Sequence, residues 1–165
     1  ELVDVTRECA HMAVLVGSKV WYIDKIASPQ PLKVDHPICS LAPLHCTANG
    51  KVLLAFQPNE VIEEALRAPR ARYTENTIVD PAVLRSQLAE IRQAGYCIER
   101  EEFIADIRRI AAPVFDFNGT VIAAIAVVGP SARITEGQIE ALVPLTLRTA
   151  ESISRSLGHK PYKDA

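Results

Sequence analysis

Two short, mostly apolar runs near the start of the chain are typical of β-strands. They cover residues 12–16 and 20–26, and Gly17 and Ser18 between them favour a tight turn. Residues 31–36, PLKVDH, are predicted to form a third short strand. The opening part of the chain is therefore expected to hold a β-hairpin followed by a further strand.

The middle of the chain carries the 3.6-residue period of helices instead. The first predicted helix begins after Thr47, which can cap it, and Pro58 separates it from a second helix over residues 60–68. A third helix begins at Asp80, a capping residue followed by proline, and ends at Gly95. The apolar residues expected to face the core from the second and third helices are Val61, Ile62, Ala65, Leu66, Val83, Leu84, Leu88 and Ile91.

Strand patterns return in the last third of the chain. One strand is predicted over residues 96–100, and two more flank the Asn-Gly pair at 118–119, a strong hairpin signal. Thr135 and Gln138 resemble a capping box at the start of a long helix, in which Pro144 should cause a kink or a new start.

The order of these elements is strands, helices, then strands closed by a helix, without a regular βαβ repeat. This order predicts an α/β fold of the α+β kind, with helices flanking a mostly antiparallel sheet. The chain has 165 residues, of which 48% are hydrophobic and 23% charged, which suits one folded domain over residues 1–165.

Charge and hydropathy narrow the possible partners. The net charge of -2 argues against this chain holding DNA or RNA by itself. No apolar run approaches the length of a membrane span and no signal peptide is evident, so a cytoplasmic protein without membrane contact is expected. The chain opens at Glu1 and its first turn resembles the end of a helix, so a longer parent protein is also expected.

Cysteine and histidine positions do not predict a metal site. The four cysteines form no CxxC pair and are expected to be reduced thiols. Four possible ligands gather in one stretch, but their H-x2-C-x5-H-C spacing matches no common zinc pattern; they are His36, Cys39, His45 and Cys46. Neither a metal nor another cofactor is predicted.

Catalytic signatures are absent from the sequence. There is no nucleophile elbow, metalloprotease motif, phosphate-binding loop or dinucleotide motif. His45 and Cys46 are adjacent and should point in different directions, which disfavours a nucleophile and base. Glu99, Glu101 and Glu102 are interpreted as a solvated acidic rim rather than an acid–base pair. We therefore do not predict an enzyme.

Two arginines stand at the start of the apolar strand that precedes the Asn-Gly turn. Side chains of a strand alternate between its faces, so Arg108 and Arg109 should point to opposite sides, and at least one should point into a largely apolar region. A buried guanidinium needs a partner. Glu99 or Asp106 could neutralise it, and so could an anionic ligand.

A second candidate binding feature is the start of the helix after Thr47. The first N–H groups of a helix lack internal partners and attract carboxylates or phosphates, and the small residues Ala48, Asn49 and Gly50 would let a ligand reach them. The alternative is that Thr47 only caps the helix.

Several motifs in order resemble the effector-binding domain of the IclR family of transcriptional regulators. They are PLHCTANGKVLLAF, NTIVDPAVL, LAEIRQAGYCIEREE, IAAPVFDFNGTVIAAIAVVGPSARIT and AESISRSLG. The resemblance covers nearly the whole chain and implies a GAF-like domain that encloses a pocket for a small metabolite. It also implies an upstream winged helix-turn-helix that makes the only DNA contact, and assembly into a homodimer or tetramer. The alternatives are a GAF-like sensor with a different output and an oligomerisation module.

The same resemblance implies a set of effector-binding positions. Backbone amides of Ala48 and Asn49 would hold a carboxylate of the effector, and an acid of the family falls at Glu99. The apolar wall would be formed by Val34, Ala42 and Ile107.

Three further positions depart from the relatives that bind small oxo-acids. Arg109 replaces a cysteine, and Ala126 and Val128 replace serines. Asp106 also replaces a common glycine, so the loop backbone before the strand is expected to differ. These changes favour an anionic effector with an apolar body, such as an aromatic or longer aliphatic carboxylate. In the competing interpretation, Arg109 pairs with Glu99 and makes the pocket smaller.

Overall fold

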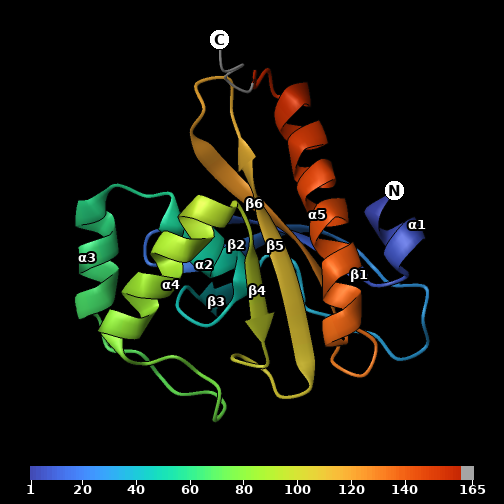
Figure 1. The fold of residues 1–165 in the computed structure, drawn as a ribbon, viewed down its shortest axis with the longest axis horizontal. Helices are drawn as coiled ribbons and strands as arrows, with labels where there is room; N and C mark the ends of the chain where they lie inside the picture. The colour runs from blue at the N-terminus through green and yellow to red at the C-terminus, as the bar shows by residue number, and fades with distance from the viewer. Residues whose placement is uncertain (161–165) are drawn as a thin grey trace.

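The computed structural model describes residues 1–160 and is built on a six-stranded sheet in the order β3-β2-β1-β6-β5-β4, with every neighbouring pair antiparallel. The strands are β1 (Cys9–Val16), β2 (Lys19–Ile26), β3 (Leu41–Pro43), β4 (Cys97–Arg100), β5 (Ile107–Phe115) and β6 (Val121–Pro130). The helices are α1 (Leu2–Thr6), α2 (Ala48–Ala55), α3 (Asn59–Arg67), α4 (Pro81–Ala94) and α5 (Glu136–Ser156). Figure 1 shows α2, α3 and α4 on one side of the sheet and α5 on the other, which confirms the predicted α/β class.

Several helices and turns begin or end at the capping and turn residues expected from local sequence signals. Gly17 and Gly119 adopt φ values of 57° and 78° in the two hairpin turns, where a side chain would be strained. The Asp80 carboxylate accepts hydrogen bonds from the amides of Ala82 and Val83, and Gly95 ends α4 at φ 77°. The capping box at the start of α5 is also confirmed.

The predicted strand over residues 31–36 is wrong, and the third strand of the first half is β3 instead. Residues 27–40, here named the strap, have no regular structure. Cys39 and Ser40 form two backbone hydrogen bonds with Tyr22 of β2, and the rest of the strap is attached mainly through side chains. The Cys9 thiol donates to the Val34 carbonyl, and the Lys25 ammonium contacts the Asp35 carboxylate. The strap therefore crosses the sheet without a ladder of backbone hydrogen bonds.

Two helical expectations also need correction. Pro144 does not re-set the last helix, since α5 continues through it from Glu136 to Ser156. Thr146 and Thr149 donate their hydroxyls to carbonyls of the preceding turn in the same region. Val61 and Val83 are 36% and 52% exposed, so neither belongs to the buried face of its helix. The buried faces are formed by Ile62 and Leu66 in α3 and by Leu84, Leu88 and Ile91 in α4.

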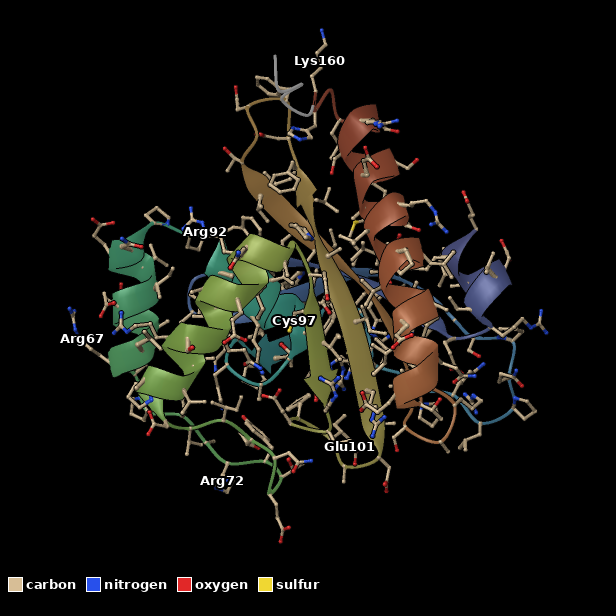
Figure 2. The ribbon with its side chains drawn as sticks, viewed as in Figure 1. Arg67, Arg72, Arg92, Cys97, Glu101 and Lys160 are labelled. Carbon is tan, nitrogen blue, oxygen red and sulfur yellow. The ribbon has the colours of Figure 1, made fainter. Side chains whose placement is uncertain are left out.

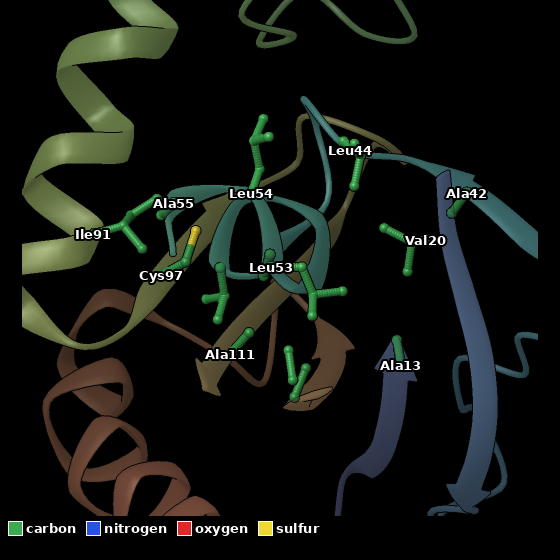
Figure 3. Packing of buried hydrophobic residues seen from close by; sticks show 14 of the residues in the cluster. Ala13, Val20, Ala42, Leu44, Leu53, Leu54, Ala55, Ile91, Cys97 and Ala111 are labelled. Carbon is green, nitrogen blue, oxygen red and sulfur yellow. The ribbon is translucent and has the colours of Figure 1, made fainter. Parts of the chain in front are cut away.

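Apolar side chains pack on both faces of the sheet. On one face α2 lies directly over small side chains of the strands, among them Ala13 and Ala111, and Leu53 points toward that floor (Figure 3). Every residue of α2 is buried, which explains why its sequence carries no clear polar face. On the other face α5 covers a second cluster that includes Ile110 and Val127.

Charged side chains gather mostly at the periphery. Figure 2 shows Arg67, Arg72 and Lys160 extending outward, while Cys97 lies at the centre. Among the helices of the described residues, none has the length and apolar character needed to cross a membrane. The charged side chains buried on the α2 face are the exceptions, and they mark the candidate site.

Candidate functional site

Arg109 is the arginine of the pair that points into the interior. It lies on β5 opposite Glu99 of β4, and its Nη1 is 2.5 Å from a Glu99 carboxylate oxygen. The Arg109 residue is 2% exposed and Glu99 is fully buried. Arg108 points to the other face and pairs with Glu101 and Glu136. The predicted alternation is therefore confirmed, and the internal partner is Glu99 and not the exposed Asp106.

The Glu99 carboxylate is held by backbone as well as by Arg109. Its second oxygen accepts hydrogen bonds from the amides of Glu102 and Phe103, at 2.5 and 3.3 Å. Two residues of the loop between β4 and β5, Glu101 and Asp106, have a left-handed backbone conformation with positive φ. Asp106 has φ 61°, a left-handed conformation that aspartate tolerates better than most residues.

A second buried ion pair lies beside the first. Lys51 of α2 contacts both carboxylate oxygens of Glu102, and the two residues are 0% and 5% exposed. Burial raises the pKa of Glu102, and the neighbouring Lys51 opposes that rise. The interpretation of Glu99 and Glu102 as a solvated rim is therefore wrong, because each finds a cation from another element inside the fold.

Arg109 has donors that Glu99 does not use. Nη1 makes the single side-chain hydrogen bond of Arg109 within residues 1–160. The guanidinium carbon lies 5.6 Å from the centre of the Phe103 ring, a cation–π distance. A guanidinium carries five N–H donors, so this single hydrogen bond leaves four of them without an acceptor among the described residues.

The N-terminus of α2 shows both features considered from the sequence. The Thr47 hydroxyl accepts from the amide of Gly50 at 3.1 Å and donates to the Pro43 carbonyl at 2.8 Å, so it caps the helix. The amides of Ala48 and Asn49 have no acceptor in the described part of the chain. The Asn49 side-chain amide donates to the Ala124 carbonyl of β6 at 2.9 Å, which fixes the helix start over the sheet.

The sheet beneath that helix start is small and apolar. Ala126 of β6 lies between Ala111 and His11 in register, and Val128 lies between Arg109 and Cys9. The predicted wall residues pack into the same cluster; they are Val34 from the strap, Ala42 from β3 and Ile107 from β5. The structure therefore brings all nine predicted positions to one face of the sheet, and their contact with an effector remains a prediction.

Four aromatic or imidazole side chains on this face were missed from the sequence. The His36 ring lies 4.7 Å from Tyr22 and 6.3 Å from both His11 and Phe103, centre to centre. Alternation along β1 could have placed His11 beside Cys9 and Ala13 on the inner face. No local signal could have brought His36 there, because the strap has no regular structure.

Cys39, Cys46 and His45 were the other candidate metal ligands in the sequence. Cys39 is exposed, Cys46 is buried, and the His45 imidazole bonds the Ala71 carbonyl at 2.9 Å. No cluster of three or more His, Cys, Asp or Glu suited to a metal occurs within residues 1–160. Burial raises the pKa of Cys46 to about 12, so its thiol stays protonated and is a poor nucleophile.

The strap covers this face in the observed arrangement. A cavity of about 190 Å³ opens beside α1 and α5, and one of about 210 Å³ opens behind α2; neither is lined by Arg109 or Glu99. Val34 and His36 of the strap pack against the face that carries Arg109. The strap therefore lies over part of the face that carries Arg109.

Comparison with known proteins identifies the family to which this fold and sequence are similar. Residues 1–155 match the family model described as the bacterial transcriptional regulator IclR C-terminal. The chain is 33% identical over 165 residues to the HTH-type transcriptional regulator BhcR of Paracoccus denitrificans, covering 99% of this chain and 58% of that protein.

Solved structures agree with the sequence match. The Thermotoga maritima IclR structure superposes with a TM-score of 0.90 at 33% identity, covering 96% of this chain and 64% of that one. An IclR homolog from Microbacterium hydrocarbonoxydans, complexed with 4-hydroxybenzoate, gives a TM-score of 0.87 at 29% identity, covering 94% and 63%. The chain thus spans less than two thirds of each of these relatives. With its antiparallel sheet, its flanking helices and this match, the chain belongs to the IclR family of bacterial transcriptional regulators, in their C-terminal region.

Proposed function

We propose that residues 1–165 form the effector-binding domain of a DNA-binding transcriptional regulator and bind a small carboxylate on the face between α2 and the strap. The observation that carries the proposal is a buried arginine with unused donors on the same face as two unpaired helix N-terminal amides. Both features favour an anion, and together they would hold a carboxylate by charge and by hydrogen bonds. The 4-hydroxybenzoate complex of the Microbacterium homolog supports this class of ligand.

The floor of the site favours an apolar body on that carboxylate. Ala126 and Val128 offer no hydroxyl, and Val34 and Ile107 add further apolar surface. A small oxo-acid would find few hydrogen-bond partners on this floor, whereas an aromatic or longer aliphatic acid would bury apolar area there.

The pairing of Arg109 with Glu99 is compatible with ligand binding. Glu99 occupies Nη1 and neutralises the guanidinium in the free protein, so the cation is not left unpaired when no ligand is bound. The remaining N–H groups would then donate to the effector without breaking that pair. Under this proposal Arg109 would have two partners, Glu99 and the carboxylate of the effector.

A DNA-binding output requires a segment outside this chain. We propose a winged helix-turn-helix upstream of Glu1, with the effector domains joining subunits into a homodimer or tetramer in the cytoplasm. The match to HTH-type regulators, of which the chain covers little more than half, supports this arrangement. Effector binding would act by favouring one arrangement of subunits over another.

Thermal unfolding with a panel of carboxylates tests the proposal. Benzoate, hexanoate and pyruvate are each added to this chain and to its Arg109→Gln and Arg108→Gln variants. A saturating acid at one hundred times its Kd should stabilise the native state by about 2.7 kcal/mol. We expect benzoate or hexanoate to stabilise the parent and the Arg108→Gln control but not Arg109→Gln. Equal stabilisation of both variants, or none by any acid, would overturn the proposal.

A further inference from the structure

A single arginine joins the strap to the turn between α1 and β1. Arg133 precedes α5, and its Nη2 donates to the Leu32 carbonyl of the strap at 2.9 Å. The same nitrogen donates to one carboxylate oxygen of Glu8 at 2.9 Å, and Nε contacts the other oxygen. Glu8 directly follows the last residue of that turn, Arg7. One guanidinium therefore bonds both the strap and the residue at which α1 gives way to β1.

The turn that Arg133 contacts is confined by its surroundings. Glu8 is 4% exposed, and its carboxylate lies so close to the backbone of Gly129 that a Cβ there would be 2.6 Å from Glu8 Oε2. Arg7 has φ 60°, a left-handed conformation that arginine rarely adopts. Such a conformation persists only when neighbouring contacts hold it. Loss of a contact at Glu8 should therefore loosen the turn and the attachment of α1.

The strap is the more mobile of the two partners of Arg133. Its start is fixed, because Ser28 is 2% exposed and its hydroxyl donates to the Arg7 carbonyl at 2.6 Å. Farther along, Leu32 is 71% exposed, and the Asp35 carboxylate is held through Lys25 of β2. A segment with few buried contacts and no backbone ladder opens at a lower free energy than the sheet.

Arg133 itself stands on a firm base. Its amide and that of Ile134 both donate to the Pro130 carbonyl at 2.9 Å, and the Ile134 side chain is fully buried. The guanidinium is therefore a fixed post between a segment that opens easily and a turn that depends on its contacts.

We infer that Glu8 and Arg133 couple the strap to α1, so that opening of the strap loosens the turn between α1 and β1. The strap lies over part of the face to which we assign effector binding, and α1 lies at the N-terminal end of this chain, toward the proposed helix-turn-helix. The coupling would pass a change at that face to the DNA-binding segment. This regulatory meaning rests on the proposed function, whereas the coupling itself needs no ligand.

Two readouts measure the strap and α1 separately. The Cys9 thiol is 2% exposed and bonds the Val34 carbonyl and the Ser28 amide, so a thiol reagent should reach it only when the strap opens. The Arg7 amide donates to the Val3 carbonyl at 2.8 Å, so its hydrogen exchange, followed by NMR, reports loosening of α1. The exposed Cys39 is replaced by serine throughout, and mass spectrometry identifies the labelled thiol.

The strap is perturbed away from α1 and the response is compared between backgrounds. His36→Ala removes the ring that packs against Tyr22 and Phe103. We expect it to raise both the Cys9 labelling rate and the Arg7 exchange rate by about threefold or more, the effect of losing one aromatic contact. In an Arg133→Gln background the labelling rate should still rise, whereas the exchange rate should change by less than about 1.5-fold, because the two partners are no longer joined.

Arg100→Gln is the matched control. It breaks an exposed ion pair with Glu136 at the start of α5 and leaves the strap untouched, so both responses should persist. If Arg133→Gln does not fold, as circular dichroism would show, Arg133→Lys carries the test, since lysine keeps a cation for Glu8 but lacks the planar fork that reaches both partners.

The results distinguish coupling from general support of the fold. A residue that only stabilised the fold would change the two rates in its own background and leave their response to His36→Ala intact. An Arg7 response that survives substitution of Arg133, or that is absent from the parent while Cys9 labelling rises, overturns the inference. So does unchanged Cys9 labelling in His36→Ala, because the strap then does not open as a separate element. No acid is added in these measurements, so their failure leaves the proposed function standing, and a failure of carboxylates to bind leaves the coupling standing.

Discussion

Replacing Arg109 by methionine removes a buried charge while keeping most of the side-chain length. Glu99 would keep its two backbone hydrogen bonds but lose its guanidinium partner, in a position with no solvent exposure. Breaking a buried pair in this way costs about 3–5 kcal/mol, and the retained backbone bonds favour the lower end. For a chain of this size a loss of about 3 kcal/mol lowers Tm by roughly 6–12 °C.

Arg108→Met is the matched control, one residue away on the other face of the same strand. Its ion-pair partners Glu101 and Glu136 are partly exposed, so its ion pairs contribute about 1 kcal/mol or less. Urea unfolding followed by circular dichroism measures both variants and the parent. Equal losses of unfolding free energy for the two variants, or a loss below 1 kcal/mol for Arg109→Met, would refute the assignment of a buried, structurally coupled pair.

Three further predictions follow from single positions. Gly50→Ala should lower the free energy of unfolding in urea by about 1–3 kcal/mol, because its Cβ would lie 2.5 Å from the Leu44 carbonyl oxygen. Gly137→Ala, which has open space around it, should raise that free energy by about 0.5–1 kcal/mol. Equal effects of the two substitutions would contradict the packing of α2. Asp80→Ala should lower the free energy of unfolding by about 1 kcal/mol, because alanine lacks the oxygen that caps α4. Asp80→Asn keeps such an oxygen and should lower it much less. Equal losses in thermal unfolding would contradict the capping role of Asp80. The pKa of His11 is about 6.5 in the unfolded chain, its ordinary value, but about 4 in the fold. Between these two pH values the unfolded chain binds more protons than the folded one. The free energy of unfolding therefore falls by up to about 3 kcal/mol as the pH drops from 6.5 to 4. His11→Gln should flatten that part of the pH profile of unfolding free energy, and an unchanged slope would show that His11 is not buried as a neutral ring.

Elements fixed by local chemistry could be predicted from the sequence. The turn at Gly119, the cap at Asp80 and the stop at Gly95 each depend on the conformational demands of a single residue. Alternation along β5 likewise placed one arginine inward, since it needs only the strand itself. The strap could not be predicted, because its path depends on side-chain contacts such as Lys25 with Asp35 and not on a backbone period.

The partners of buried charges depend on contacts between distant parts of the chain. Glu99 and Glu102 appear solvated when only their neighbours in sequence are considered. Their burial follows from Lys51, which lies 51 residues before Glu102, and from the register that sets Arg109 opposite Glu99. The His11–His36 pair has the same origin, since only the folded strap brings the two rings together.

The Glu99–Arg109 pair is difficult to explain by stability alone. Apolar residues of similar volume often replace a buried ion pair at no cost, or even with a gain of 1–4 kcal/mol. A Glu99→Gln, Arg109→Met double variant should therefore recover most of the stability that Arg109→Met loses, because no unpaired charge remains. It should still fail to bind benzoate or hexanoate, since the donors for the carboxylate are gone. Recovered folding with lost binding would show that the arginine is retained for the ligand, whereas recovered binding would assign the carboxylate to the amides of α2.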